Sequence, residues 1–202
     1  ELVLHEVSVG WPDGSVLLAG VDLTVGPGQS VALVGPSGLG KTTLAATIMG
    51  LIPARAGQLS VPGRVGYLAQ NAHIFATTLA ENVRIGNKDA TDDQVLEAMH
   101  QAGLQLDPQR EVGEQGATLS GGEAQRVALA RLLVAGERPS LVILDEPTEH
   151  LDRETADALM DDLFSSLSDS TLLVITHDQD LMARCARVID LTRWAVSPSL
   201  PR

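Results

Sequence analysis

The residues with the clearest chemistry form one glycine-rich stretch that follows the apolar run Ser30–Val34. The stretch fits the pattern G-x-x-x-x-G-K-[S/T] and consists of Gly35, Pro36, Ser37, Gly38, Leu39, Gly40, Lys41, Thr42 and Thr43. In such a loop the glycines let backbone N–H groups turn toward phosphates, Lys41 places a cation against the β and γ oxygens, and the Thr42 hydroxyl can ligate Mg²⁺. A helix predicted from Lys41 to about Gly50 points its positive dipole end at the same anion. The stretch predicts a nucleoside triphosphate site, and a plain glycine-rich turn is the alternative.

Two carboxylates end a second apolar run. Leu141–Leu144 reads as a buried parallel strand that delivers Asp145 and Glu146 at its carboxyl-terminal edge. Asp145 would hold Mg²⁺ through water, because that ion keeps much of its hydration shell. Glu146 is placed to orient and polarise an attacking water. The alternative interpretation is a solvated acidic turn. A phosphate loop in the same chain argues against this alternative.

A third motif, Leu-Ser-Gly-Gly-Glu, begins a predicted helix at residue 119. Ser120 and Glu123 have the spacing of a capping box, in which each side chain satisfies a backbone donor of the other residue. Gly121 and Gly122 leave the backbone at this helix N-terminus open as a second anion site. A capping box alone needs no glycine here, and each one costs up to about 1 kcal/mol relative to alanine. That cost favours a phosphate or an approaching partner backbone.

The composition limits the class of protein. The chain has 202 residues, of which 44% are hydrophobic and 2% aromatic, so we expect one domain with a core of Val, Leu, Ile and Ala, as in a parallel sheet covered by helices. The net charge of -12 disfavours nucleic acid and anionic lipid as main partners. The apolar runs are far shorter than the ~20 residues that a membrane-spanning helix needs.

The start of the chain and its cysteine suggest its context. Because the sequence starts at Glu1 with neither an initiator Met nor a signal-peptide pattern, we expect it to be part of a longer protein. Cys185 is the only cysteine, so no disulfide can form within the chain, which suits a reducing compartment. We interpret Cys185 as an ordinary residue on a helix face.

Hydropathy patterns place the remaining elements. Alternation predicts an antiparallel pair at the sheet edge, and two short strands follow it, at Leu2–Val9, Gly20–Val25, Gln58–Val61 and Val65–Ala69. A helical pattern runs from Ala80 to about Gly103, and its expected buried face consists of Val95, Leu96, Met99 and Ala102. A later helix begins at Asp152 with an apolar stripe of Ala156, Leu159, Met160, Leu163 and Leu167. The strand Thr171–Thr176, a short helix from Gln179 and a strand near Ala186–Leu191 complete the pattern.

These motifs occur in the order seen in ATP-binding-cassette (ABC) ATPases: the phosphate loop, Gln70, Leu-Ser-Gly-Gly-Glu, Leu-Asp-Glu-Pro, Leu151-Asp152 and His177. The chain resembles that family over nearly its whole length. The resemblance implies the α/β P-loop NTPase fold of ABC ATPases, with a mainly parallel sheet, an antiparallel β edge and a helical lobe. It implies a single domain in which residues 1–70 and 137–191 form the nucleotide-binding core, 71–136 the helical subdomain and 192–202 a loosely ordered tail.

The resemblance also implies a composite site in a head-to-tail dimer. ATP and Mg²⁺ would lie between the phosphate loop of one subunit and Ser120, Gly121 and Gly122 of the other, where Glu123 replaces the commoner Gln. Gln70 would sense the γ-phosphate beside the metal and link it to the transport domains, and Asp152 would bridge to the partner site. His177 would contact the γ-phosphate and fix Glu146, although an ordinary strand-end histidine is the alternative. Trp11 stands where the family often stacks an aromatic on adenine; it could instead shield a sheet edge.

Further segments resemble exporters within the family. Ile74–Val83 is typical of the groove for the coupling helices of a membrane domain, and Glu111–Gly116 of the cross-linking loop, with a solvated loop as the alternative. The resemblance implies transmembrane domains upstream and a place on the cytoplasmic face of the bacterial inner membrane. Glu149 and His150 resemble one subunit of the heterodimeric thiol-reductant exporter needed for cytochrome bd assembly. His150 could equally titrate at the dimer interface or face solvent.

Two other classes of function stay open. The chain could be an ATP-dependent dimerisation module with a weak site, although Lys41, Asp145, Glu146 and His177 form a complete set. It could also be a soluble cassette protein that acts on DNA or ribosomes. The charge of -12 and the lack of a long coiled-coil insertion disfavour that class. The usual glycine-containing final hairpin is not found after Ile189–Leu191, which leaves C-terminal regulatory contacts in doubt.

Overall fold

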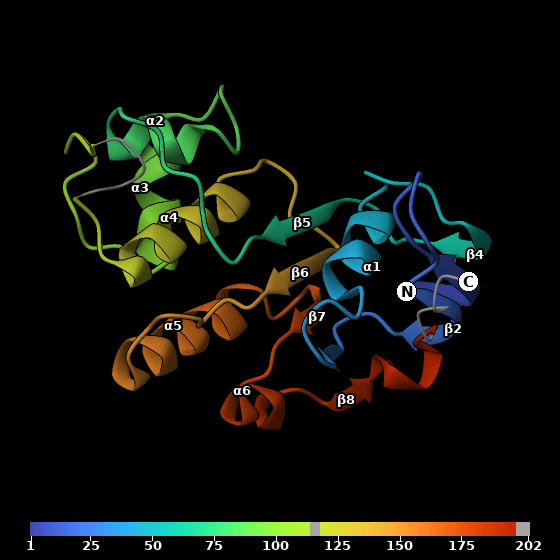
Figure 1. Cartoon of the computed structure of the whole chain (residues 1–202). Helices are drawn as coiled ribbons and strands as arrows, with labels where there is room; N and C mark the ends of the chain where they lie inside the picture. The colour runs from blue at the N-terminus through green and yellow to red at the C-terminus, as the bar shows by residue number, and fades with distance from the viewer. Residues whose placement is uncertain (114–117, 197–202) are drawn as a thin grey trace. The chain divides into compact units, whose positions relative to one another are not determined.

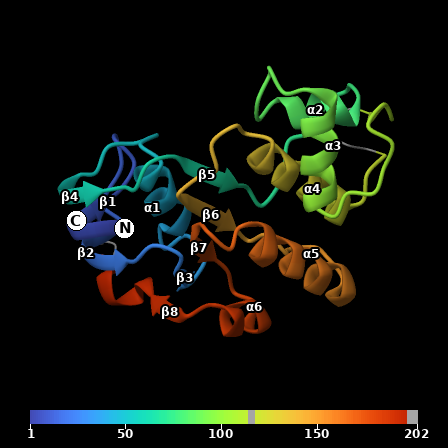
Figure 2. The ribbon, with the colours of Figure 1, turned by 180° about the vertical axis from the view of Figure 1, so that it is seen from behind.

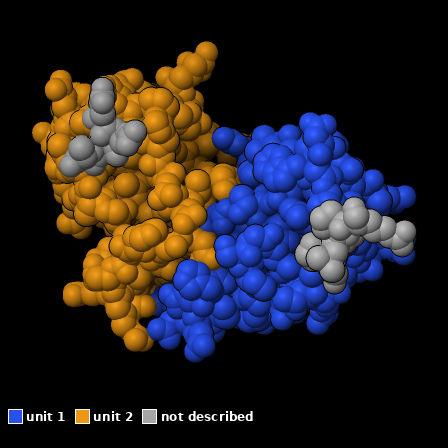
Figure 3. Space-filling model, viewed as in Figure 1, with its two compact units in different colours: residues 1–65, 140–145, 171–202 blue, residues 66–139, 146–170 orange. Residues whose placement is uncertain are grey.

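The computed structural model of the chain describes residues 1–113 and 118–196 and divides into two units, each made of separate segments of the sequence (Figures 1 and 3). The first unit, blue in Figure 3, consists of residues 1–65, 140–145 and 171–202. The second unit, orange in Figure 3, consists of residues 66–139 and 146–170. The sequence placed residues 146–170 in the nucleotide-binding core, whereas the contacts group them with the helical segment.

A parallel sheet forms the centre of the first unit. Its strands run in the order β6 (Leu141–Asp145), β7 (Thr171–Ile175), β3 (Ser30–Val34) and β8 (Arg187–Asp190). Every residue of β6 and β7 is buried, which explains their continuous apolar runs. The register pairs Asp145 and Leu33 with Ile175, so β6, β7 and β3 end at the same edge. Figures 1 and 2 show β6 and β7 side by side.

An antiparallel sheet adds a second layer to this unit. Its order is β2 (Leu18–Val25), β1 (Leu2–Val9) and β4 (Ala56–Ser60), which confirms the predicted antiparallel pair. The register of β1 shifts on both sides, and Glu6 there has a φ of 49°. A Cβ at Gly57 would lie 2.3 Å from the Glu6 carbonyl oxygen, so this bulge requires glycine in the facing strand.

Among its described residues, the first unit also contains two helices and a short 3-10 turn: α1 (Lys41–Ile48), α6 (Gln179–Arg184) and η2 (Leu191–Trp194). The expectation of a loosely ordered tail from residue 192 is wrong for the part that the structure describes. Leu191 is buried, Ala195 bridges to Leu18, and the Val196 N–H donates to the Leu17 carbonyl at 3.0 Å. The tail is held because it pairs with the start of β2. Residues 197–202 lie outside the described residues.

The second unit is mainly helical. The strand β5 (Val65–Leu68) leads into it, and its helices are α2 (Leu79–Arg84), α3 (Asp92–Gln101), α4 (Gly121–Leu133) and α5 (Arg153–Ser166). The helical pattern expected from Ala80 to Gly103 is thus two helices. The chain leaves α2 at Gly86, whose Cβ would lie 1.9 Å from the Arg131 carbonyl oxygen, and a capping box of Thr91 and Gln94 starts α3.

The buried face of α3 differs in one position from the prediction. Val95, Ala98, Met99 and Ala102 are buried and have the i, i+3, i+4, i+7 spacing of one helix face. Leu96 is 48% exposed, so its predicted burial is wrong. It lies at the margin of that face, where hydrophobicity alone does not decide burial.

The contact of α5 with α4 explains why residues 146–170 belong to the second unit. Arg126 on α4 forms an ion pair with Asp162 on α5, and its guanidinium also donates to the Ala102 carbonyl at 2.8 Å. The predicted apolar stripe of α5 supports this packing through Leu159, Met160 and Leu163, which are buried. Within the described residues, no helix is both long and apolar enough to span a bilayer.

Candidate functional site

The phosphate loop connects β3 to α1, as the sequence predicts. Gly38 and Gly40 have φ values of 78° and 110°, a region that glycine enters without the strain other residues meet. Gly40 is the N-cap of α1, and among the described residues no side chain caps this end. The first N–H groups of α1 therefore remain available to an anion.

Lys41 and Thr42, the first two residues of α1, make separate contacts. The Lys41 ammonium donates to the Gly35 carbonyl at 2.7 Å and to the Pro36 carbonyl at 3.0 Å, so it lies over the phosphate loop. The Thr42 hydroxyl donates to Oδ2 of Asp145 at 3.2 Å. Asp145 is only 6% exposed at the end of β6. The fold thus brings together two oxygen groups that lie 103 residues apart in the sequence.

Glu146 follows Asp145 directly and begins a tightly turned segment. Its φ is 47°, a left-handed conformation uncommon outside glycine. The Glu149 N–H donates to the Glu146 carbonyl at 3.1 Å, and the Leu151 N–H donates to the Thr148 carbonyl at 3.2 Å. His150 is also left-handed, with a φ of 66°. Such strain in a non-glycine pair next to Asp145 is typical of functional segments.

His177 and Trp11 lie in the first unit and are both exposed. His177 comes two residues after Ile175, which is the register partner of Asp145, so it leaves the sheet at the same edge as Asp145. Trp11 belongs to a turn closed by a hydrogen bond from the Gly14 N–H to its carbonyl at 2.9 Å. Of its surface, 56% is exposed, so the indole offers a face for stacking.

The motif at the start of α4 contains the predicted capping box. The Ser120 hydroxyl accepts from the Glu123 N–H at 3.2 Å, and the Glu123 carboxylate accepts from the Ser120 N–H at 2.7 Å. The glycines also have a packing reason that the sequence did not reveal. A Cβ at Gly122 would lie 2.5 Å from Cγ2 of Thr155, and one at Gly121 would lie 3.1 Å from Cδ2 of Leu151.

Asp152, at which the sequence predicts a helix to begin, is the N-cap of α5. Its carboxylate accepts from the Thr155 hydroxyl at 2.7 Å and from the Thr155 N–H at 3.1 Å. These two hydrogen bonds, the hydroxyl first, lower the pKa of Asp152. Thr155 therefore contacts both the glycine at the start of α4 and the aspartate at the start of α5.

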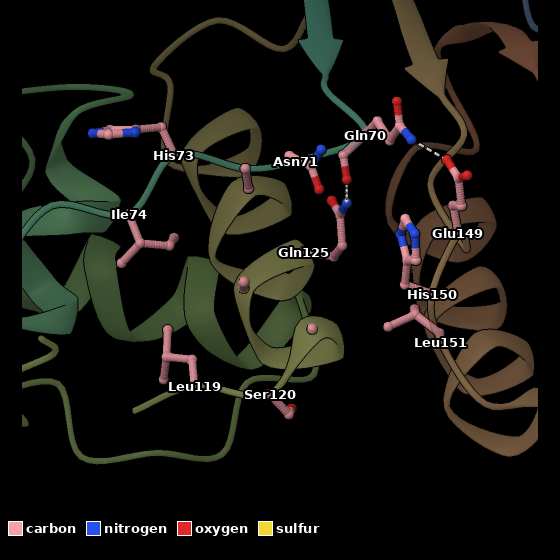
Figure 4. A pocket seen from close by; sticks show the side chains of 13 residues that line it. Gln70, Asn71, His73, Ile74, Leu119, Ser120, Gln125, Glu149, His150 and Leu151 are labelled. Carbon is pink, nitrogen blue, oxygen red and sulfur yellow. Dashed lines mark hydrogen bonds between the residues drawn. The ribbon is translucent and has the colours of Figure 1, made fainter. Parts of the chain in front are cut away.

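Gln70 lines a cavity of about 440 Å³ within the second unit (Figure 4). The side chain of Gln125 donates to the Gln70 carbonyl at 2.6 Å and to the Ala69 carbonyl at 3.3 Å. The Gln70 amide in turn donates to the Glu149 carboxylate. Sequence reasoning missed Gln125, whose only signal was a polar residue among the apolar positions of α4. The lining includes Gln70, His73, Ser120, Gln125, Glu149 and His150.

A half-buried cation holds the segment that follows Gln70. Arg131 donates to the Asn82 carbonyl and to the Asn82 side-chain oxygen, both at 2.8 Å, and to the His73 carbonyl at 2.7 Å. Desolvation lowers the pKa of Arg131. Asn82, which is fully buried, bonds both backbone groups of Phe75. The exporter-like segment Ile74–Val83 is thereby tied to α4.

Two further positions have limited roles. Burial raises the pKa of the Cys185 thiol to about 11, so the thiol is protonated at neutral pH and unreactive, in line with its interpretation as an ordinary residue. Of the proposed cross-linking loop, Glu111 forms a bridge with Thr78, and the Val112 N–H donates to the Thr77 carbonyl. The remainder of that loop includes residues 114–116, which lie outside the described residues.

Comparisons with known proteins agree with this fold and these motifs. A family model described as ABC transporter matches residues 18–149. ATP-binding cassette sub-family B member 6 of Xenopus tropicalis is 32% identical over 96% of this chain and 26% of its own length. The ATP-dependent lipid A-core flippase of Chromobacterium violaceum is 34% identical over 93% of this chain and 35% of its own length.

A solved structure, described as a bacterial Atm1-family ABC exporter with ATP bound, matches with a TM-score of 0.84 and 29% identity over 95% of this chain and 37% of that one. The chain therefore belongs to the ABC transporter family, as an ATPase domain of the exporter type. This confirms the predicted ABC ATPase fold. The chain spans only 26% and 35% of the lengths of the two curated relatives.

The contact between Gly122 and Thr155 yields a stability test. Gly122→Ala should lower the free energy of unfolding, because overpacking costs about 1–3 kcal/mol and the gain in helix propensity returns at most about 1 kcal/mol. In a Thr155→Ser background, which keeps the hydroxyl and removes the clashing methyl, the same change should be neutral or stabilising. Urea unfolding of the four chains measures this coupling. An equal effect in both backgrounds would show that Gly122 has no packing role.

Proposed function

We propose that this chain binds ATP with Mg²⁺ at the carboxyl edge of its parallel sheet and hydrolyses it to drive export through membrane domains of the same transporter. The observation that carries the proposal is the hydrogen bond of Thr42 with Asp145, because it joins the phosphate loop to the strand end that precedes Glu146. Family membership supports it independently.

The donor set fits Mg²⁺. Thr42, Asp145 and Gln70 offer hydroxyl, carboxylate and amide oxygens, the hard ligands that this ion prefers. A site with few protein carboxylates is the kind that Mg²⁺ shares with substrate phosphates. Bound there, the ion would neutralise charge on the phosphate oxygens.

We assign the protein's own steps as follows. Lys41 exchanges its two loop carbonyls for phosphate oxygens, and the N–H groups of the loop and of α1 hold the same anion. Glu146 orients and polarises the water that attacks the γ-phosphate in line. His177 contacts the γ-phosphate and fixes Glu146. The Trp11 ring stacks on the adenine.

The proposed catalytic unit is a head-to-tail dimer of ABC ATPase domains. Ser120, Gly121 and Gly122 of one domain close the site of the other, where the capped start of α4 presents N–H groups to the opposed phosphate. Glu123 lies beside this contact, and Asp152 bridges to the partner site. A dimerisation module with a weakly hydrolytic site is the second candidate, and Lys41, Asp145, Glu146 and His177 together favour the competent one.

The full transporter would sit in a membrane. We propose that transmembrane domains lie upstream on the same full-length chain and that this domain works at the cytoplasmic face of the bacterial inner membrane. The matches to a lipid A-core flippase and to an Atm1-family exporter support this placement. The net charge of -12 argues against the alternative of a soluble cassette protein on nucleic acid.

Glu146→Gln in the full transporter should lower ATP turnover about 100-fold or more, the contribution of a positioned general base, while ATP binding is retained. The carboxamide keeps the shape of the side chain but accepts a proton poorly. Phosphate release and equilibrium binding of labelled ATP measure the two effects. Glu154→Gln on the first turn of α5 is the matched control and should leave both unchanged. Undiminished hydrolysis by the Glu146→Gln transporter would refute the role of Glu146.

A more specific proposal concerns the transported substrate, and it rests on the likeness of Glu149 and His150 to one exporter subunit. We propose a heterodimeric exporter of thiol reductants, glutathione or cysteine, linked to cytochrome bd assembly. Inverted membrane vesicles that contain the full transporter should then accumulate labelled glutathione or cysteine with ATP, and vesicles with the Glu146→Gln transporter should not. If the wild-type vesicles hydrolyse ATP and accumulate neither thiol, the substrate proposal fails and the ATPase assignment stands.

A further inference from the structure

Gln70 is held at its backbone by a side chain from α4. Gln125 is 5% exposed, and its amide donates to the carbonyls of Gln70 and Ala69 at 2.6 and 3.3 Å. A buried amide with two backbone acceptors has little freedom to move. The main chain at Gln70 is therefore held to α4 through Gln125 (Figure 4).

The side chain of Gln70 is held separately, by Glu149. A carboxylate can only accept hydrogen bonds, so it must bond the NH₂ group of the Gln70 amide and not its oxygen. This contact selects one of the two orientations that an amide can take by rotation about its last bond. In the selected orientation Glu149 accepts from one of the two N–H donors, and the amide oxygen points away from the carboxylate, where it can serve as a metal ligand.

Glu149 itself lies on a tight turn. Its N–H donates to the Glu146 carbonyl at 3.1 Å, and both Glu146 and His150 are in the left-handed region. These constraints fix the backbone on both sides of Glu149 without using its carboxylate. The turn thus holds the backbone of Glu149 in place and leaves its carboxylate to accept the hydrogen bond from Gln70.

We propose that Glu149 is a positioning residue for Gln70: its carboxylate takes the amide NH₂ group and so presents the amide oxygen to Mg²⁺. The inference rests on the proposed function, in which Gln70 is a ligand of the metal. The loss of a group that orients a metal ligand typically lowers metal affinity 10- to 100-fold. Glu149 would act through Gln70 without touching the metal or ATP.

The test measures Mn²⁺ binding to the full transporter in the presence of a nonhydrolysable ATP analogue. The electron paramagnetic resonance signal of free Mn²⁺ reports how much of the ion is bound. Glu149→Ala should raise the dissociation constant of Mn²⁺ about tenfold, because the Gln70 amide loses its fixed orientation. Glu149→Gln keeps an acceptor of the same reach and should raise it less than Glu149→Ala does. Binding of the analogue in EDTA and the thermal midpoint should not change, which separates positioning from a structural role.

Two further variants separate the role of Glu149 from the role of Gln70. Glu97→Ala removes the acceptor of a similar glutamine-glutamate pair on α3, where Gln101 donates to Glu97 at 2.6 Å, and should leave Mn²⁺ binding unchanged. Gln70→Ala should weaken Mn²⁺ at least as much as Glu149→Ala does. If Gln70→Ala weakens Mn²⁺ and Glu149→Ala does not, the role of Glu149 is overturned and that of Gln70 stands. If neither variant weakens Mn²⁺ binding, Gln70 is not a ligand of the metal. If Glu97→Ala weakens Mn²⁺ binding as much as Glu149→Ala does, the effect is not specific to the contact with Gln70, and the role of Glu149 is overturned.

Discussion

The parallel register of β6, β7 and β3 is the constraint on which the other features depend. Hydrogen bonding in this ladder forces three strands from distant parts of the sequence to end at one edge. The phosphate loop follows β3, Asp145 ends β6 and is followed by Glu146, and His177 comes two residues after the end of β7. The Thr42 to Asp145 hydrogen bond then ties the loop to the acidic strand end. Buried aliphatic residues make the chemistry possible because they fix this register.

In the second unit, a few polar contacts hold segments of the chain in place, as apolar packing does in the parallel sheet. Gln125 holds the backbone of Gln70, Arg131 holds the segment after it, and Thr155 contacts the start of both α4 and α5. The contacts of Gln125 and Arg131, and that of Thr155 with Gly122, join residues far apart in the sequence. The buried Gln125 amide favours one arrangement, because the loss of its carbonyl acceptors would leave its NH₂ group unsatisfied.

Much of the fold was predictable because strong local patterns determine it. The residue ranges of β1 and β3, the start of α1 at Lys41 and the capping box at Ser120 follow from alternation, glycine spacing and helix-cap chemistry. The exposure of Leu96, the pairing of Ala195 with Leu18 and the contact of Glu149 with Gln70 were not predictable. They depend on which segments meet in space, and a single sequence contains no local signal for that.

The central claim is that the carboxyl edge of the parallel sheet binds ATP with Mg²⁺. Amide chemical shifts of the ¹⁵N-labelled chain during a titration with MgATP test it most directly. The claim predicts that the largest changes fall on Gly35 to Thr43 and on the residues that follow β6 and β7, with an indole N–H change at Trp11. Saturation with MgATP that leaves these signals in place, or shifts only signals elsewhere in the chain, would contradict it.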